Sequence, residues 1–141
     1  MIYLDNSATT RQYDEVTDLM IRLQREEFGN PSSLHSMGFE AGNYIFDARE
    51  ALSRTFPRDV RIVFTSGGTE ADNWAVFGTV KRMGKRGKHI ITTAVEHHSI
   101  LNCMHELEAQ GFDVTYLQPD SLGNISLDAL KSALRPDTIL V

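Results

Sequence analysis

From residue 61 to residue 141, short apolar runs alternate with longer segments of helical periodicity, and this alternation restricts the fold more than any other feature. The runs are rich in β-branched residues and predict strands, whereas the segments between them repeat apolar residues at helical spacing. Such alternation predicts an α/β fold with three layers (α/β/α) and a mainly parallel sheet. The predicted strands are 61–65, 88–94, 112–117 and 138–141, and the predicted helices are 69–82, 99–110 and 127–134.

The first 60 residues predict two further helices. Apolar residues at positions i, i+3, i+4 and i+7 predict a helix over 13–27. An apolar stripe predicts a second helix over 36–54. Gly29–Ser33 lies between them, and its glycine, proline and serines favour a turn.

The predicted strand at 61–65 passes into a helix through a turn that contains Gly67 and Gly68. The first N–H groups of a helix lack internal acceptors, and the helix dipole adds positive charge there, so this geometry suits a phosphate. The hydroxyl groups of Ser66 and Thr69 are candidate additional donors. The turn matches neither the dinucleotide nor the nucleoside-triphosphate motif. A tight connection that uses glycine only for its backbone freedom is the alternative interpretation.

A second polar cluster, Glu96–His98, follows the predicted strand at 88–94. Ligands of parallel sheets gather at the carboxyl ends of the strands, so this cluster and the glycine turn are predicted to face one crevice. A metal site with Cys103 or His105 matches no standard ligand spacing. The remaining interpretations are a polar surface loop and an imidazole that stacks on a flat ligand.

Composition restricts the partners and the compartment. A net charge of -5 argues against a nucleic-acid partner that binds through bulk electrostatics. The single cysteine, Cys103, excludes an internal disulfide and fits a reducing compartment, and its helical setting predicts a small buried residue. No apolar run has membrane-spanning length and the N-terminus carries no signal pattern, so a cytoplasmic protein is expected.

The last residues, 138–141, have the pattern of a buried strand. Native chains usually finish in exposed polar residues and not within a core element. We therefore expect these 141 residues to be the N-terminal part of a longer protein. The expected consequence is an open sheet edge with exposed apolar faces, which favours self-association.

Four motifs occur together in this order, and together they resemble the N-terminal part of cysteine desulfurases, which are pyridoxal-phosphate enzymes of the class V aminotransferase family. They are YLDNSATT at 3–10, GNPSSLH at 29–35, TSGGTE at 65–70 and EHH at 96–98. The resemblance implies part of the large domain of a type I pyridoxal-phosphate enzyme. It also implies two regions, an N-terminal active-site segment at 1–14 and the first part of the cofactor-binding domain at 15–141.

The resemblance also implies roles for individual residues. Gly68 and Thr69 match the turn that holds the cofactor phosphate, and His97 matches the histidine that stacks on the pyridine ring and takes part in proton transfer. Four further residues match segments at the substrate site: Asn6, Ala8, Thr9 and His35. No metal ligand is predicted, since the spacing of the histidines and Cys103 matches no standard pattern.

The implied reaction converts L-cysteine to L-alanine and transfers the sulfur to an enzyme cysteine as a persulfide, for iron–sulfur cluster assembly or tRNA thiolation. The implied partners are a second copy of the chain and a sulfur-acceptor protein such as an iron–sulfur scaffold. The Schiff-base lysine and the catalytic cysteine of the family are expected beyond Val141, so this segment alone is expected to be inactive and to bind pyridoxal 5'-phosphate weakly or not at all. The alternatives are another class V enzyme (a selenocysteine lyase or an aminotransferase) and a non-catalytic phosphate-ligand or scaffold domain.

Overall fold

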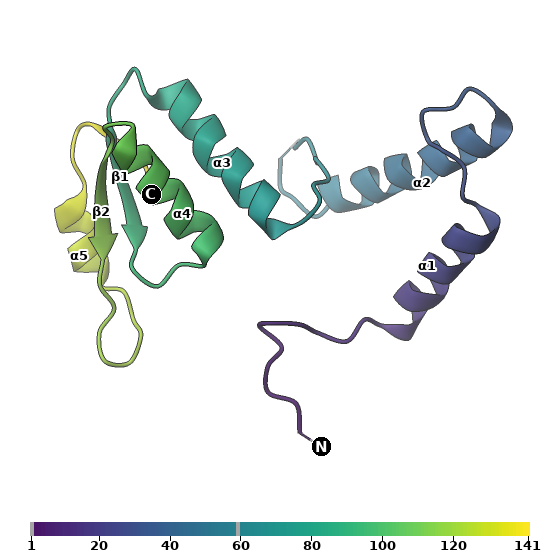
Figure 1. Ribbon diagram of the computed structural model, residues 1–141, viewed down its shortest axis with the longest axis horizontal. Coiled ribbons are helices and arrows are strands. Elements are labelled where there is room, and N and C mark those ends of the chain that lie inside the picture. The colour runs from purple at the N-terminus through teal and green to yellow at the C-terminus, as the bar shows by residue number, and fades with distance from the viewer. Residues whose placement is uncertain (1, 59) are drawn as a thin grey trace. The chain divides into compact units, whose positions relative to one another are not determined.

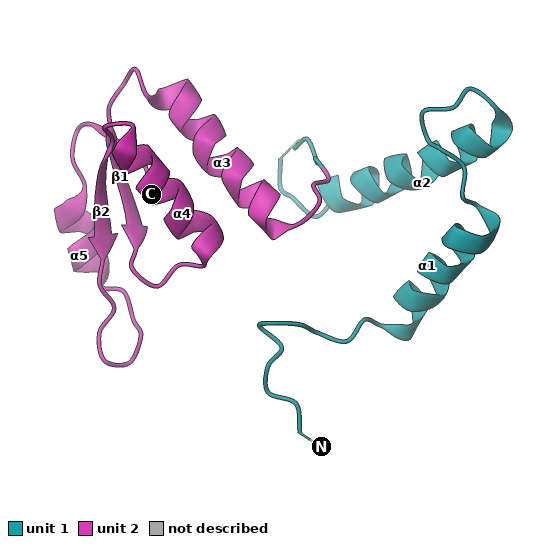
Figure 2. Cartoon of the chain, in the orientation of Figure 1, with its two compact units in different colours: residues 1–63 teal, residues 64–141 magenta. Residues whose placement is uncertain are grey.

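The computed structural model describes residues 2–58 and 60–141 (Figure 1). The chain divides into two compact units, Met1–Val63 (unit 1) and Phe64–Val141 (unit 2), which Figure 2 shows in different colours. Unit 1 contains the two N-terminal helices, and unit 2 contains the sheet with the helices that cover it. The division of the complete protein at residues 14 and 15 stays a prediction.

Unit 1 has the two helices that the sequence predicts. Helix α1 covers Asp14–Glu26 and helix α2 covers Ser36–Ser53, which confirms the predictions over 13–27 and 36–54. The apolar stripe of α1 stays largely exposed within this unit, because none of its residues is buried and only Leu23 is half-buried. Helix α2 buries only Gly38 and Ala41.

The turn between α1 and α2 packs main chain closely against main chain. A Cβ atom on Gly38 would overlap with the carbonyl oxygen of Ser33, and one on Gly29 would overlap with that of Met37. Both positions therefore require glycine for its small volume. The Gly-Asn-Pro-Ser-Ser segment thus has a structural role, since it turns the chain tightly onto the start of α2.

Unit 2 contains a parallel three-stranded sheet with the strand order β2-β1-β3. Strand β1 pairs with β2 along its whole length, and its pairing with β3 is shorter, with an irregularity between His89 and Ile90. The strands cover His89–Thr93 (β1), Asp113–Leu117 (β2) and Thr138–Leu140 (β3). The strands predicted over 88–94, 112–117 and 138–141 are therefore confirmed, as is their parallel direction.

Three helices complete unit 2. They are α3 (Gly68–Met83), α4 (His98–Ala109) and α5 (Leu127–Ala133). The connection through α4 leads from β1 outward to β2, and the connection through α5 leads back from β2 to β3 on the other side of β1. Right-handed crossovers in opposite directions place α4 and α5 on opposite faces of the sheet, and Figure 1 shows this arrangement. The predicted three-layer α/β/α fold is confirmed.

The core of unit 2 lies between the sheet, α3 and α4. Its buried residues come from one face each of α3 and α4 and from β1: Val76, Val80, Ile90, Cys103, Met104 and Leu107. Partly buried residues of β2 and β3, Val114 and Leu140 among them, pack against this cluster.

A buried histidine at the amino end of β1 connects the three strands. His89 on β1 has no exposed surface. Its Nδ1 lies 2.7 Å from Oγ1 of Thr138 on β3, and its Nε2 lies 2.9 Å from Oγ1 of Thr115 on β2. Both ring nitrogens therefore have partners, which is the condition for burying a polar ring at low cost.

The strand predicted over 61–65 is wrong, because these residues form no strand in the structure. The β-branched run gives a high strand propensity, but a strand exists only where its N–H and C=O groups pair with a neighbour. The sheet of the described residues consists of β1, β2 and β3, and none of them pairs with this segment. The side chains of Val63 and Phe64 are accordingly about half exposed (45% and 47%).

Candidate functional site

The glycine turn leads directly into α3. Gly67 is the N-cap residue and Gly68 the first residue of the helix. A Cβ atom on either glycine would meet no atom within 4 Å, so the space beside the turn is open. Since the first N–H groups of a helix have no acceptor within it, an anion can approach the main chain here.

The carboxylate of Glu70 takes up both donors of Ser66. The main-chain N–H and the hydroxyl group of Ser66 each donate to Oε2 of Glu70 at 2.7 Å. The N–H bond, followed by the hydroxyl bond, lowers the pKa of Glu70 below its ordinary value. The sequence makes the Ser66 hydroxyl a candidate donor for an anion. In the structure this hydroxyl is bonded to Glu70 and does not face the open space. Gly68 and Thr69 are left as the donors for an anion at this turn.

His97 lies at the start of α4 and caps this helix. Its Nδ1 accepts a hydrogen bond from the main-chain N–H of Ser99 at 3.1 Å, and the Oγ atom of Ser99 lies 2.8 Å from the same nitrogen. The imidazole is exposed, whereas Ser99 is buried. Local capping therefore fixes one ring nitrogen and leaves Nε2 on the open side.

A side-chain hydrogen bond joins the starts of α3 and α4. The hydroxyl group of Ser99 donates to Oδ2 of Asp72 at 2.6 Å. Asp72 lies one turn after Gly68 on α3, and Ser99 lies in the first turn of α4 beside His97. The two connections that the sequence predicts to share a crevice are thus tied to each other through this contact.

Sequence reasoning missed Asp72 and Ser99, although the sequence carries a signal for both. Asp72 precedes Val76 and Val80 at intervals of four residues, and both valines are buried in the core. Ser99 precedes the buried Cys103 at the same interval on α4. A polar residue in line with a buried stripe needs a hydrogen-bond partner, and here the two residues serve each other.

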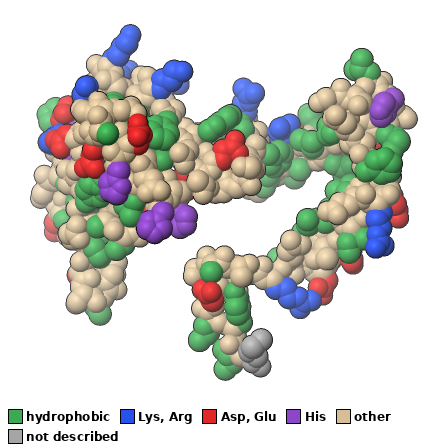
Figure 3. Space-filling model, in the orientation of Figure 1, with side chains coloured by type: hydrophobic (Ala, Val, Ile, Leu, Met, Phe, Trp, Pro, Cys, Tyr) green, Lys and Arg blue, Asp and Glu red, His purple; other side chains and the backbone are tan. Residues whose placement is uncertain are grey.

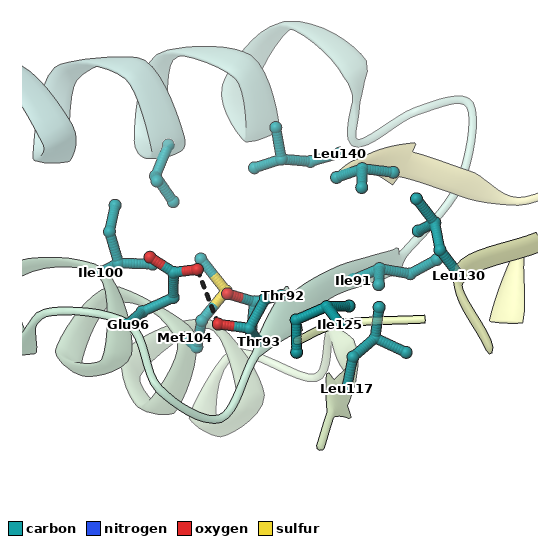
Figure 4. A pocket seen from close by; sticks show the side chains of 12 residues that line it. Ile91, Thr92, Thr93, Glu96, Ile100, Met104, Leu117, Ile125, Leu130 and Leu140 are labelled. Atoms are coloured by element: carbon teal, nitrogen blue, oxygen red, sulfur yellow. Dashed lines mark hydrogen bonds between the residues drawn. The ribbon is translucent and has the colours of Figure 1, made fainter. Parts of the chain in front are cut away.

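A pocket of about 320 Å³ lies at the carboxyl ends of the strands (Figure 4). Its walls are largely apolar, with Ile91 from β1, Leu117 from β2 and Leu140 from β3. At one side the Thr93 hydroxyl donates to Oε1 of Glu96 at 2.7 Å. None of the predicted cofactor residues lines this pocket. Its apolar walls also offer no donor set for a phosphate, so it is distinct from the predicted site.

The predicted substrate-site residues belong to unit 1, where each takes part in local structure. Nδ1 of His35 accepts the Gly38 N–H at 3.3 Å and so caps α2. The others lie in a compact turn near the N-terminus. In that turn the Ala8 N–H donates to Asp5, the Thr9 carbonyl accepts from Tyr3, and the Asn6 carbonyl accepts from Thr10. A role of Asn6, Ala8, Thr9 and His35 toward a substrate stays a prediction.

Cys103 is a buried core residue, as the sequence predicts. Its thiol donates to the carbonyl oxygen of Ser99 at 3.0 Å. Burial raises the pKa of this thiol, and the charge of Asp72 raises it further. Since the thiolate is the reactive form, Cys103 is unsuited to act as a nucleophile.

Comparison with known proteins decides the family. A family model described as "Aminotransferase class-V" matches residues 2–141. The chain belongs to the class V aminotransferase family. Cysteine desulfurase IscS of Methanosarcina thermophila is 46% identical over 141 residues, which are 99% of this chain and 35% of the relative. The predicted resemblance to cysteine desulfurases is thereby confirmed.

Solved structures of class V relatives agree with this assignment. A NifS-like protein matches with a TM-score of 0.88 and 40% identity over 97% of this chain and 38% of its own. The structure of SspA in complex with cysteine matches with a TM-score of 0.81 and 38% identity over 96% of this chain and 40% of its own. The class V chain described here spans a little over a third of the length of the curated relatives it matches, 37% and 35% for the first two.

Class V aminotransferases and the cysteine desulfurases among them depend on pyridoxal 5'-phosphate. The start of α3 fits the phosphate end of this cofactor, because the space outside Gly67 and Gly68 is open and the Thr69 side chain is exposed. The exposed ring of His97 provides a flat surface at the neighbouring helix start. In the part of the chain that the structure describes, no helix has the length and apolar character needed to cross a membrane.

Proposed function

We propose that this chain is the cofactor-binding part of a cysteine desulfurase. In the proposed reaction the carbon–sulfur bond of L-cysteine breaks, L-alanine is released, and the sulfur forms a persulfide with an enzyme cysteine. The identity of 46% with a desulfurase and the likeness to SspA in complex with cysteine support this reaction. The geometric observation that carries the proposal is the Ser99–Asp72 hydrogen bond of 2.6 Å, which joins the helix start at His97 to the helix start at Gly68.

In this proposal the start of α3 binds the cofactor phosphate through the Gly68 N–H and the Thr69 hydroxyl group. An anion at a helix start gains about 0.3–1 kcal/mol, and up to about 2 kcal/mol when it is partly buried. The ring of His97 covers the flat heterocycle and exchanges a proton through Nε2. The electron sink for the reaction is supplied by pyridoxal 5'-phosphate when it is bound.

The remaining parts of the proposal come from the family. The partners are the substrate L-cysteine, a sulfur-acceptor protein such as an iron–sulfur scaffold, and a second copy of the protein in a homodimer. The product sulfur serves iron–sulfur cluster assembly or tRNA thiolation in the cytoplasm. The lysine that binds the cofactor and the persulfide-forming cysteine are expected beyond Val141. The proposed substrate-site residues are Asn6, Ala8, Thr9 and His35.

The test is an assay of the product of the complete reading frame with L-cysteine. We expect bound cofactor by absorbance, and alanine and released sulfur in equal amounts when a thiol reduces the persulfide. His97→Ala should lower turnover strongly, while His105→Ala on the same helix serves as the matched control. Turnover of selenocysteine alone would instead indicate a selenocysteine lyase, and a keto acid product would indicate an aminotransferase. Either result would contradict the proposal.

The 141-residue chain alone should neither turn over L-cysteine nor bind pyridoxal 5'-phosphate tightly. Binding costs roughly 4–15 kcal/mol of translational and rotational freedom. Without a covalent bond to the cofactor, the interactions at the helix start and with a stacked ring contribute only about 1–4 kcal/mol of favourable binding free energy together. Titration calorimetry should therefore show a Kd weaker than micromolar. Micromolar or tighter binding would show that this segment forms a complete cofactor site.

A further inference from the structure

Two groups of Ser99 hold the same nitrogen of His97. The main-chain N–H of Ser99 lies 3.1 Å from Nδ1 and can only donate, so Nδ1 is the acceptor in this arrangement. The proton of a neutral ring is then on Nε2. Capping of α4 thus fixes the tautomer of His97 in addition to the direction of its ring.

The hydroxyl group of Ser99 adds a second, switchable partner. A carboxylate accepts only, so the hydroxyl proton is given to Asp72 across 2.6 Å. The lone pairs of Oγ, 2.8 Å from Nδ1, then remain for a proton on that nitrogen. When the ring is neutral, Nδ1 accepts from the Ser99 N–H. When the ring carries two protons, Nδ1 donates to Oγ, and Oγ donates to Asp72.

The surroundings make this arrangement rigid. Ser99 is only 7% exposed, and Asp72 is partly buried. Both residues lie on helices, α3 and α4, which pack against each other in the core of unit 2. Hydrogen bonds between buried groups on packed helices are stronger and lose less entropy than those of exposed side chains.

We propose that Ser99 and Asp72 are positioning residues for His97. They hold Nδ1 whether it accepts from the Ser99 N–H or donates to Oγ, so that the ring keeps its orientation while Nε2 faces the cofactor and substrate. Asp72 acts only through Ser99, because its carboxylate touches the hydroxyl group and not the ring. This inference rests on the proposed function.

The first test measures the mobility of the His97 ring in the absence of the cofactor. In the 141-residue chain, the NMR order parameter of the His97 Cε1–H bond should lie near the rigid value of about 0.85 and fall below about 0.6 in Ser99→Ala. Ser99→Thr, which keeps the hydroxyl group, should retain the rigid value. Ser132→Ala and Asp128→Ala, on the exposed surface of α5, are matched controls, and an amide correlation spectrum verifies that each variant is folded.

A double-mutant cycle tests whether Asp72 acts through Ser99. Asp72→Ala should lower the order parameter of the His97 ring less than Ser99→Ala does. In the Ser99→Ala background, Asp72→Ala should cause no further decrease. Asp72→Asn, which keeps an acceptor oxygen, should retain most of the order. A full additional effect in the double variant, or an unchanged ring in a folded Ser99→Ala chain, would overturn the proposal.

The second test uses the complete gene product with its cofactor. Ser99→Ala should lower kcat about tenfold, while KM and cofactor content should stay within about twofold of wild type. The size of this effect is taken by analogy from metal sites, where removing the hydrogen-bond partner of a histidine ligand costs about 10- to 100-fold. The induced circular dichroism of the bound cofactor should change, and Ser99→Thr should restore it. A looser ring with unchanged kcat would mean a merely structural link and would overturn the proposal. A gene product without desulfurase activity would overturn the proposed function alone, because the order parameter is measured without cofactor.

Discussion

The two units of this chain contain similarly clear helical patterns but differ sharply in what they bury. In unit 2 the stripes of α3 and α4 close onto the sheet and form a core that includes Val76 and Leu107. In unit 1 the stripe of α1 stays on the surface, with Leu19 and Met20 exposed to 42% and 44%, and α2 exposes Phe46 to 61%. Figure 3 shows hydrophobic side chains on the surface of unit 1. An amphipathic pattern therefore predicts a helix and its apolar face, but only a partner inside the same unit buries that face.

Truncation of a core side chain should give the largest difference between the units. Ile90 on β1 is fully buried, so Ile90→Ala removes packing on all sides and should cost about 2–5 kcal/mol of unfolding free energy. Leu19→Ala in unit 1 should cost less than about 1 kcal/mol because the side chain is already half exposed. Urea unfolding followed by the fluorescence of Trp74 reports on unit 2, and far-ultraviolet circular dichroism reports on both units. Equal losses of unfolding free energy for Ile90→Ala and Leu19→Ala would contradict the difference in burial between the two units.

The buried histidine of unit 2 should be almost as important as its apolar core. His89→Ala removes two hydrogen bonds and leaves Thr115 with a poorly satisfied hydroxyl group, which should cost about 2–4 kcal/mol. His105→Ala, at an exposed position on α4, should change stability by no more than about 0.5 kcal/mol. Thermal unfolding measures both values. If His89→Ala and His105→Ala have the same unfolding temperature, the His89 ring does not connect the strands as described.

The exposed faces of unit 1 should cause self-association of the 141-residue chain. Leu19→Lys places a charge in the exposed stripe of α1 and should weaken association about tenfold, which corresponds to roughly 1.4 kcal/mol. Sedimentation velocity over a range of concentrations measures this change. Asp18→Lys, which reverses the charge at the neighbouring position outside the stripe, is the control. A wild-type chain that sediments as a clean monomer would remove the basis for the comparison.

The smallest expected effect concerns the pH dependence at the start of α3. The pKa of Glu70 is lowered in the folded chain, so its ionised form stabilises folding fully above the ordinary value of 4.5. This contribution disappears as the pH falls from 4.5 through the lowered pKa of the folded chain. Wild type should be slightly more stable than Glu70→Gln at pH 7, and the difference should vanish at the acid end of this range. Chemical denaturation at several pH values checks this, with Glu40→Gln as the control.

Periodicity and turn residues were sufficient to predict most elements of both units. The boundaries of α1, α2 and β1–β3 lie within one or two residues of the predictions, because the spacing of apolar residues follows the repeat of the helix or strand. Alternation also predicted the parallel sheet and its three layers, since right-handed crossovers leave few other topologies. The buried state of Cys103 followed from the same helical spacing.

Tertiary structure alone decided the features that depend on a partner. Residues 61–65 have strand propensity but form no strand, because no neighbouring strand pairs with them. The Ser66 hydroxyl turns to Glu70 and away from the open space, and the contact between Asp72 and Ser99 joins residues 27 positions apart. Local sequence determines which conformations and hydrogen-bond groups are available. The packing of α3 against α4 determines which of those groups meet, and through them how His97 is held.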